Sequence, residues 1–249
     1  MKSDRDRSVR LLWEAPAEPT RGPKAALSQS RVVEAAIEVA DAEGVEALTM
    51  RRVAETLGFT TMSLYRHVPG KSELLDLMVD AVWGETEHTP RGPWRAGLEF
   101  FARQVWAMYR AHPWMLQLTA SRRMPGPQAM TRQDAAYAVV SELGLASEEI
   151  VAVVTAVSHF VDGVGRTMAD RVQAERETGV SEEDWWSGRE ALWEHFTPDR
   201  LPMMTHIWNS GGFERMLDEF EFGLARVLDG LAVFIETEDR PLVRPQTCL

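Results

Sequence analysis

The amino-acid sequence predicts an all-α protein of two domains, and three observations carry that prediction. Apolar side chains recur with the 3.6-residue period of amphipathic helices, alternating β-branched runs are few, and Pro and Gly residues separate the periodic segments. The chain has 249 residues, more than one typical domain holds. We therefore expect an N-terminal arm (1–26), a three-helix domain with a fourth helix leading out of it (27–87), and a larger helical domain (88–249).

The first 26 residues are rich in Pro and mixed in charge, without a sustained apolar period. This composition is typical of a flexible arm, and the arm ends in the basic run Arg21-Gly-Pro-Lys24. Two roles stay open for it. It is either a solvated linker or a basic arm that reaches into a DNA groove, as the N-terminal arms of some helical domains do.

Capping signals define the first two helices of the smaller domain. Ser28 is expected to cap a helix that runs to about Ala42, because a hydroxyl at this position accepts an otherwise unpaired N–H of the first turn. Gly44 then ends it. Thr49 is expected to cap a second, short helix, which ends at Gly58 because glycine adopts the left-handed turn that follows many helices.

Two further helices complete the smaller domain. Thr60 is expected to cap a third helix that extends to His67, where the Pro69-Gly70 pair stops it. Lys71 opens the fourth helix, which has a broad apolar face and ends near Gly84.

Pro and Gly breaks divide the larger domain into four helices and one short apolar segment. The predicted helices cover about 94–111, 129–143, 147–177 and 212–235, and the apolar segment covers 114–120.

Composition disfavours several function classes. No stretch of eighteen uncharged apolar residues occurs and the N-terminus lacks the apolar core of a signal peptide, so we expect no membrane partner and a cytoplasmic location. The single cysteine, Cys248, has no partner for a disulfide or a metal site. No nucleophile motif, Gly-rich phosphate loop or paired-carboxylate motif indicates an enzyme.

A short helix, a glycine turn and a second short helix form a helix-turn-helix between Thr49 and His67, the geometry that places its second helix in a major groove. Spacing alone is weak evidence, because many helical proteins contain such a pair by chance. The net charge of −11 also argues against a nucleic-acid partner. However, residues 49–71 contain four basic side chains and only one acidic side chain, Glu55. This local excess marks where phosphates could be met.

The segment around this helix pair resembles the DNA-binding domain of the tetracycline-repressor family nearly residue for residue. It reads LTMRRVAETLGFTTMSLYRHVPGKSELLDLM, from Leu48 to Met78. Further on, HPW at 112–114 and FEFGLARVLDGL at 220–231 resemble the C-terminal domain of the subgroup nearest the tetracycline repressors. The resemblance covers about residues 27–235 and implies a regulator that binds double-stranded operator DNA.

The resemblance also implies which side chains meet DNA. The groove-facing set is Arg51, Thr61, Met62, Tyr65 and Arg66. The phosphate-contacting set is Thr49, Thr60, Ser63, Tyr65, His67 and Lys71. Within the first set, the two arginines are the candidates for bidentate recognition of guanine. For Met62, a thymine-methyl contact and packing within the domain both remain open.

Two apolar seams with alternating steps of three and four residues lie in the larger domain, and such seams favour a partner helix at a shallow crossing angle. The residues assigned to a dimer interface are Val154, Val157, Val161, Val164, Phe220, Leu224, Val227 and Leu231. An intramolecular helix pair would satisfy the same seams. The resemblance favours a homodimer, because in this family the two long C-terminal helices of each subunit form a four-helix interface.

A ligand pocket is expected in the larger domain, because its many tryptophans are spread over different helices and aromatic side chains commonly line such pockets. The candidates are Trp106, Trp114, His159, Phe160 and Asp162. No pair among the histidines has metal-ligand spacing such as HExxH, so we predict neither a metal nor a cofactor. Tetracycline binding in this family uses a magnesium ion held partly by a histidine, which has no match in this sequence.

These features together predict a repressor that a small-molecule effector of unknown identity releases from a pseudo-palindromic operator. The fourth helix would carry the coupling, because it joins the two domains. An activator and a ligand-independent regulator with the same fold remain alternatives.

Overall fold

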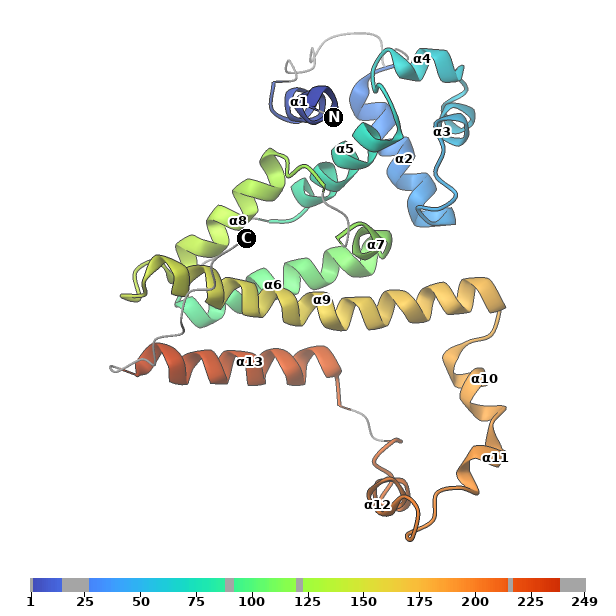
Figure 1. The fold of residues 1–249 in the computed structure, drawn as a ribbon, viewed down its shortest axis with the longest axis vertical. Coiled ribbons are helices and arrows are strands. Elements are labelled where there is room, and N and C mark those ends of the chain that lie inside the picture. The colour runs from blue at the N-terminus through green and yellow to red at the C-terminus, as the bar shows by residue number, and fades with distance from the viewer. Residues whose placement is uncertain (1, 15–26, 88–91, 120–122, 215–216, 238–249) are drawn as a thin grey trace.

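The computed structural model describes residues 2–14, 27–87, 92–119, 123–214 and 217–237. Within these ranges the chain forms thirteen helices and no strand, which confirms the all-α prediction (Figure 1). Each helix of the smaller domain was expected, the first three from their capping residues and the fourth from its apolar face. The main differences from expectation lie at the N-terminus and in residues 178–218.

The smaller domain begins as its capping signals predict. Its helices are α2 (Gln29–Glu43), α3 (Met50–Leu57), α4 (Thr61–Tyr65) and α5 (Lys71–Gly84). The Ser28 and Thr49 hydroxyls accept backbone N–H groups three residues on, and Gly58 has a φ of 72° after α3. Helix α4 ends at Tyr65, two residues before the predicted end at His67.

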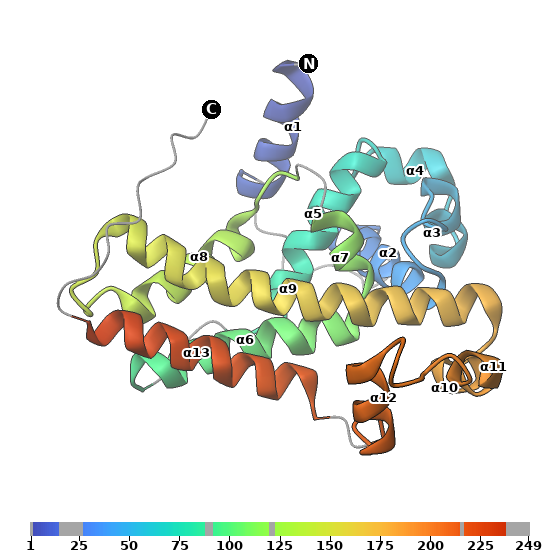
Figure 2. The same ribbon diagram turned by 60° about the horizontal axis from the view of Figure 1, so that its bottom comes forward.

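The body of the larger domain consists of four long helices and the short helix α7. They are α6 (Trp94–Ala111), α7 (Trp114–Thr119), α8 (Pro127–Val140), α9 (Ser147–Thr178) and α13 (Glu219–Glu236). Helix α9 packs against both α6 and α13, which run along it in Figure 2, and it also packs against α7 and α8. By length and apolar composition α9 could cross a membrane, but its fully buried valines serve these contacts.

Helix α13 starts at Glu219, so the prediction that it starts at residue 212 is wrong. Asp218 caps its first turn by accepting the N–H of Glu221, and Gly211 turns the chain beforehand with a φ of 67°. Phe213 and Leu217 follow the three- and four-residue spacing of the seam in the sequence. In the structure, however, both lie outside the helix and are exposed.

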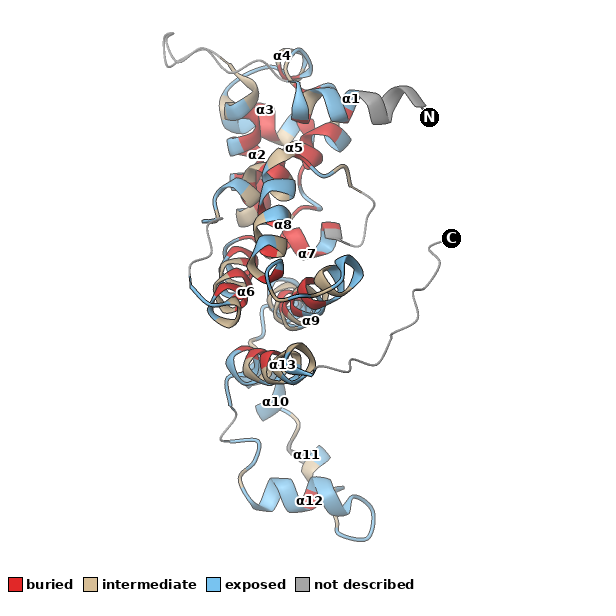
Figure 3. Cartoon of the chain, turned by 90° about the vertical axis from the view of Figure 1, so that its left-hand side faces the viewer, coloured by how far each residue is buried: buried red, intermediate tan, exposed pale blue. Residues whose placement is uncertain are grey.

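Three short helices between α9 and α13 reach away from the helical body (Figure 1). They are α10 (Glu182–Ser187), α11 (Glu190–Trp193) and α12 (Pro202–Asn209). We call residues 182–213 the aromatic arm, because its indole and phenyl rings contact one another in series from Trp185 to Phe213. Most of the arm is exposed (Figure 3).

The prediction of a flexible N-terminal arm is wrong for its first half, because residues Lys2–Trp13 form helix α1. The prolines that suggested flexibility all follow residue 15, whereas the first half contains good helix formers. Helix α1 packs against α5 (Figure 2). The basic run at 21–24 lies outside the described residues.

The start of α8 is held by a buried carboxylate of α5. Asp80 is 7% exposed, and its Oδ1 accepts the backbone N–H groups of Gln128 and Ala129, both at 3.0 Å. Burial raises the pKa of Asp80, while these two hydrogen bonds act in the opposite direction. The contact is close, because a Cβ at Gly126 would lie 2.2 Å from Asp80 Cγ.

We therefore expect Gly126→Ala to destabilise the protein by about 1–3 kcal/mol, since the added methyl group must push Asp80 away from α8. Urea unfolding followed by circular dichroism measures the change. Gly188→Ala is the matched control, because the nearest atom to its added Cβ would be 3.6 Å away. Equal unfolding midpoints for the two variants would contradict the assigned contact.

Candidate functional site

Helix α4 presents a row of side chains on the outside of the smaller domain. Its inner face is fixed by Leu64 and Val68, both fully buried, and its first turn by the Thr60 hydroxyl, which accepts the N–H of Ser63. The predicted DNA-contacting residues that are exposed are Thr49, Arg51, Thr60, Met62, Tyr65, Arg66 and Lys71, and those that are half-buried are Thr61, Ser63 and His67. Met62 is 72% exposed, so it does not pack in the core.

The basic side chains of this surface differ in how they are paired. Arg51 donates to Glu55 at 2.8 Å, and this hydrogen bond raises the pKa of the Arg51 guanidinium. Arg52 is bound by Glu43 on α2. The side chain of Arg66 makes no hydrogen bond or ion pair within the part of the chain that the structure describes. Among the described residues of this face, Arg66 and the exposed Lys71 are therefore the cations that are free to meet an anion.

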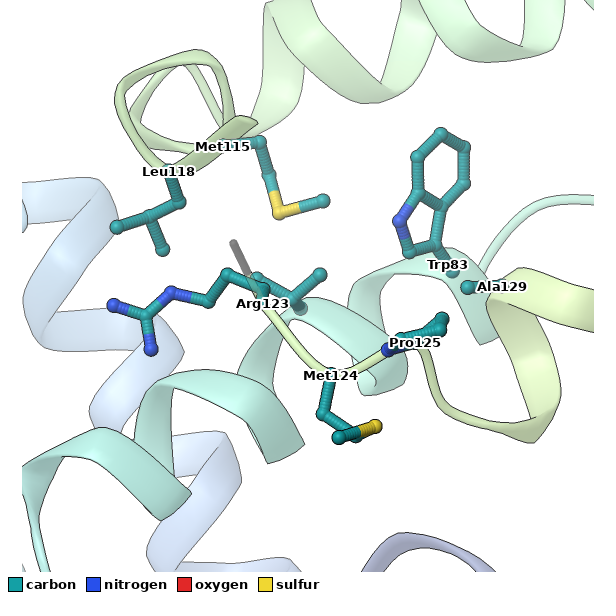
Figure 4. Close-up of a pocket in the computed structure, with 8 residues that line it drawn as sticks. Trp83, Met115, Leu118, Arg123, Met124, Pro125 and Ala129 are labelled. Atoms are coloured by element: carbon teal, nitrogen blue, oxygen red, sulfur yellow. The ribbon is translucent and has the colours of Figure 1, made fainter. Parts of the chain in front are cut away.

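An apolar pocket of about 250 Å³ lies between α5, α7 and the start of α8 (Figure 4). Its lining residues are Val79, Trp83, Met115, Leu118, Arg123, Met124, Pro125 and Ala129. Arg123 is the charged member of this set. Its Nη1 donates to Asp76 Oδ1 and to the carbonyl of Ser72, both at 3.3 Å, while its Nε is buried and has no partner among the described residues.

None of the five predicted ligand-binding residues lines this pocket, and the structure brings only two of them, Trp106 and Phe160, into one cluster. Trp106 stacks on Phe220 with ring centroids 5.0 Å apart, and Phe160 also contacts Phe220, at 6.1 Å. Both belong to an aromatic cluster between helices. Asp162 accepts a hydrogen bond from the Tyr109 hydroxyl at 2.7 Å. Burial together with the Asp162 charge raises the pKa of Tyr109.

The other two predicted ligand residues also lie apart from the pocket. His159 is exposed on α9, and Trp114 is 2% exposed at the junction of the two domains. Sequence analysis did not identify Trp83 as a pocket residue. Its place on the apolar face of the fourth helix could have indicated this role.

A hydrogen-bonded junction joins α2 to the larger domain. Asp41 Oδ1 accepts the indole N–H of Trp114 at 2.6 Å and lies 2.8 Å from His112 Nδ1. The other ring nitrogen of His112 is 3.0 Å from Glu85 Oε2, and Arg176 of α9 donates to the Asp41 carbonyl. Since α7 starts at Trp114, the helix that carries Met115 and Leu118 of the pocket is bonded directly to the smaller domain.

The apolar seams of α9 and α13 pair largely within one chain. Val154, Val157, Val161, Phe220 and Leu224 are at most 3% exposed, and Val164, Val227 and Leu231 are half-buried. The five buried residues offer no surface to a second copy, so the residue assignment of the dimer interface needs correction. The intramolecular alternative accounts for them.

The outer faces of the same two helices are open. A Cβ added at Gly163 or Gly230 would meet nothing within 4 Å, whereas one at Gly223 would lie 2.3 Å from Phe160. Apolar side chains that are exposed on the same two helices are Val151 at 47% on α9, and Phe222 at 51% and Val233 at 69% on α13.

Comparison with known proteins gives concordant results. Residues 32–78 match the family model for bacterial regulatory proteins of the tetR family, and residues 87–235 match that for the tetracyclin repressor-like C-terminal domain. The HTH-type transcriptional repressor DrrR1 of Streptomyces coeruleorubidus is 43% identical over 92% of this chain and 86% of its own length. The class C tetracycline repressor protein of Escherichia coli is 29% identical, over 82% of this chain and 90% of its own.

Solved structures agree with the sequence matches. The TetR family protein ActR of Streptomyces coelicolor, solved in complex with actinorhodin, superposes with a TM-score of 0.69 at 28% identity, covering 85% of this chain and all of its own. The two family models, the full-length relatives and the all-α fold coincide along the chain, and the protein is a member of the tetracycline-repressor (tetR) family of bacterial regulators.

Proposed function

We propose that the protein is a transcriptional repressor that binds a pseudo-palindromic operator as a homodimer and is released from it by a small-molecule effector. The observation that carries this proposal is the exposed face of α4, where Met62 projects from a helix whose other side is buried in the core and the unpaired Arg66 follows its last residue. The relatives support it, since DrrR1 is named a repressor and ActR binds actinorhodin. The protein then acts in the cytoplasm, without catalysis and without a membrane.

The effector site is the pocket beside α5. Its walls are apolar apart from Arg123, whose buried Nε lacks a partner among the described residues, so the best ligand is an apolar molecule that brings a hydrogen-bond acceptor or an anionic group. Helix α5 provides the coupling, because it starts at the helix-turn-helix and carries Val79 and Trp83 of the pocket. The Asp41 junction offers a second connection through α7.

The homodimer uses the outer faces of α9 and α13 in place of the buried seams. Gly163 and Gly230 allow a partner helix to approach closely, and the exposed Phe222 and Val233 supply apolar area. The aromatic arm connects the two helices and exposes further apolar surface next to this face. A two-fold dimer places two copies of α4 in successive major grooves, which is why the operator is expected to be pseudo-palindromic.

The experiment that tests this function is selection of fragments bound by the purified protein from the genome of its source organism. A repressor should enrich a few fragments that share a pseudo-palindrome. A reporter placed behind such a fragment should then be less active when the gene is present. Higher activity in its presence would favour the activator alternative, and failure to enrich any sequence would refute specific DNA binding.

Filling the pocket should separate ligand binding from DNA binding. In Ala129→Trp the indole occupies the pocket while the backbone N–H that Asp80 accepts is retained. We expect operator affinity to stay within about twofold, and binding of the apolar anion anilinonaphthalene sulfonate to weaken at least about tenfold. Dye fluorescence titration and operator anisotropy measure the two quantities.

Ala138→Trp is the matched control for this variant, because Ala138 is exposed on the same helix, α8. The control should bind the dye like the unmodified protein. Equal dye binding by Ala129→Trp would mean that the effector pocket is elsewhere.

A further inference from the structure

Helix α1 lies outside the residues that the two family models match, 32–78 and 87–235, yet it is bonded to the core of the protein. Ser8 is 8% exposed, and its hydroxyl donates to Asp76 Oδ2 of α5 at 2.8 Å. Leu12, 9% exposed, packs on the same side, and Arg7 lies 3.9 Å from Glu73. A helix held by a buried hydrogen bond and a buried leucine has a defined position on α5.

The same contacts reach the wall of the ligand pocket. Asp76, which accepts the Ser8 hydroxyl on one oxygen, receives Arg123 on the other at 3.3 Å. One turn further along α1, the indole N–H of Trp13 donates to the carbonyl of Pro125 at 3.1 Å. Arg123 and Pro125 both line the pocket (Figure 4). Helix α1 therefore holds the segment 123–125 directly at Pro125 and is linked to Arg123 through Asp76.

Asp76 is central to this arrangement, because it is only 6% exposed and its two oxygens face donors from two different parts of the chain. Loss of one donor leaves a buried carboxylate oxygen unpaired, which is costly. The position of α1 and the position of Arg123 are therefore energetically linked. Any ligand that depends on the 123–125 wall is linked to α1 by the same carboxylate.

We propose that α1 is a strap that closes the effector pocket, holding segment 123–125 against α5 and slowing the departure of an apolar anionic ligand. This inference rests on the proposed function of the pocket. The strap supports the pocket wall that retains the effector. Because α1 lies outside the residues that the family models match, effector affinity then depends partly on a segment outside the two matched domains.

Displacing α1 tests the strap. In Leu12→Asp a carboxylate replaces the buried leucine one turn after Ser8 and should detach α1, while the core formed by α2 to α13 keeps its own contacts. We expect the dissociation rate constant of anilinonaphthalene sulfonate to rise about tenfold, which corresponds to about 1.4 kcal/mol. Stopped-flow fluorescence measures the rate, counting only the dye signal that Ala129→Trp abolishes. Operator affinity without ligand should stay within about twofold.

Val9→Asp is the matched control, because it adds the same charge on the outer side of α1, where Val9 is 36% exposed. Its dye dissociation rate should equal that of the unmodified protein. The double variant Ser8→Ala, Trp13→Phe removes only the two hydrogen bonds. It should raise the dye dissociation rate constant by about threefold, less than the rise expected for Leu12→Asp.

Linkage supplies a second, independent readout on the unmodified protein. If α1 retains the ligand, bound dye must stabilise docked α1, so amide hydrogen exchange of residues 7–13 should slow when dye is added. Dye that binds with Ala129-dependent fluorescence, but with equal rates in all α1 variants, would overturn the strap alone. Dye fluorescence that Ala129→Trp leaves intact would instead overturn the pocket, and the strap with it.

Discussion

Replacing Arg66 with alanine is expected to weaken specific operator binding by about 1–3 kcal/mol, or roughly 5- to 150-fold. Arg66 lies at the end of α4, exposed and without a described side-chain partner, so it reaches DNA without first breaking an ion pair. Arg51 differs, because its guanidinium must leave Glu55 before it can bind a base or a phosphate. The free arginine should therefore contribute more to operator affinity than the paired one.

Fluorescence anisotropy with an operator and with a scrambled duplex, over a range of salt concentrations, measures this effect. Arg52→Ala is the matched control, since it removes the same charge from the same domain but its guanidinium is bound by Glu43. We expect Arg66→Ala to lower the ratio of specific to non-specific affinity, and Arg52→Ala to change that ratio by less than about twofold. The reverse order would move sequence recognition away from α4.

The helix-turn-helix was predictable from sequence because its determinants are local. A hydroxyl that caps a helix needs only the N–H groups two and three residues away, and Gly58 sets its own turn. The starts of α2, α3 and α4 accordingly follow Ser28, Thr49 and Thr60 as expected. The end of α4 was less predictable, because no comparable signal acts between Tyr65 and the Pro69-Gly70 pair.

The N-terminal helix and the pocket depend on contacts that are distant in sequence. Ser8 and Asp76 are 68 residues apart, and nothing near Ser8 shows that its hydroxyl will meet a buried carboxylate. The pocket combines α5, α7 and the segment after residue 122, of which each contributes only a few apolar residues. Tryptophan count favoured Trp106 and Trp114, but stacking and the Asp41 hydrogen bond place both elsewhere.

The seams of α9 and α13 show a different limit of sequence patterns. A spacing of three and four residues predicts that a helix face is buried, but it does not say whether the covering helix belongs to the same chain. Here Val154, Val157 and Leu224 are covered within the chain. The glycines distinguish a face covered within the chain from an open face. Phe160 packs against Gly223, whereas Gly230 faces open space.

Gly230→Arg is expected to dissociate the dimer and, with it, operator binding. An arginine side chain at this position fits the single chain, since an added Cβ meets no atom within 4 Å, so the subunit should fold normally. In a dimer built on the outer faces of α9 and α13, the same side chain would enter a close helix contact and bury an unpaired charge. The monomer then offers one recognition helix, and operator affinity should fall at least about 100-fold through lost bivalency.

Sedimentation velocity measures the oligomeric state, and anisotropy with full and half operators measures the loss of bivalent binding. Ala138→Arg is the control, because it adds the same side chain at an exposed position of α8, away from both outer faces. The decisive comparison is between the operators: Gly230→Arg should bind a half operator as the unmodified protein does and lose only the advantage of the full site. A Gly230→Arg protein that stays dimeric with full operator affinity would show that the two copies meet through other surfaces, for which the mostly exposed aromatic arm is a candidate.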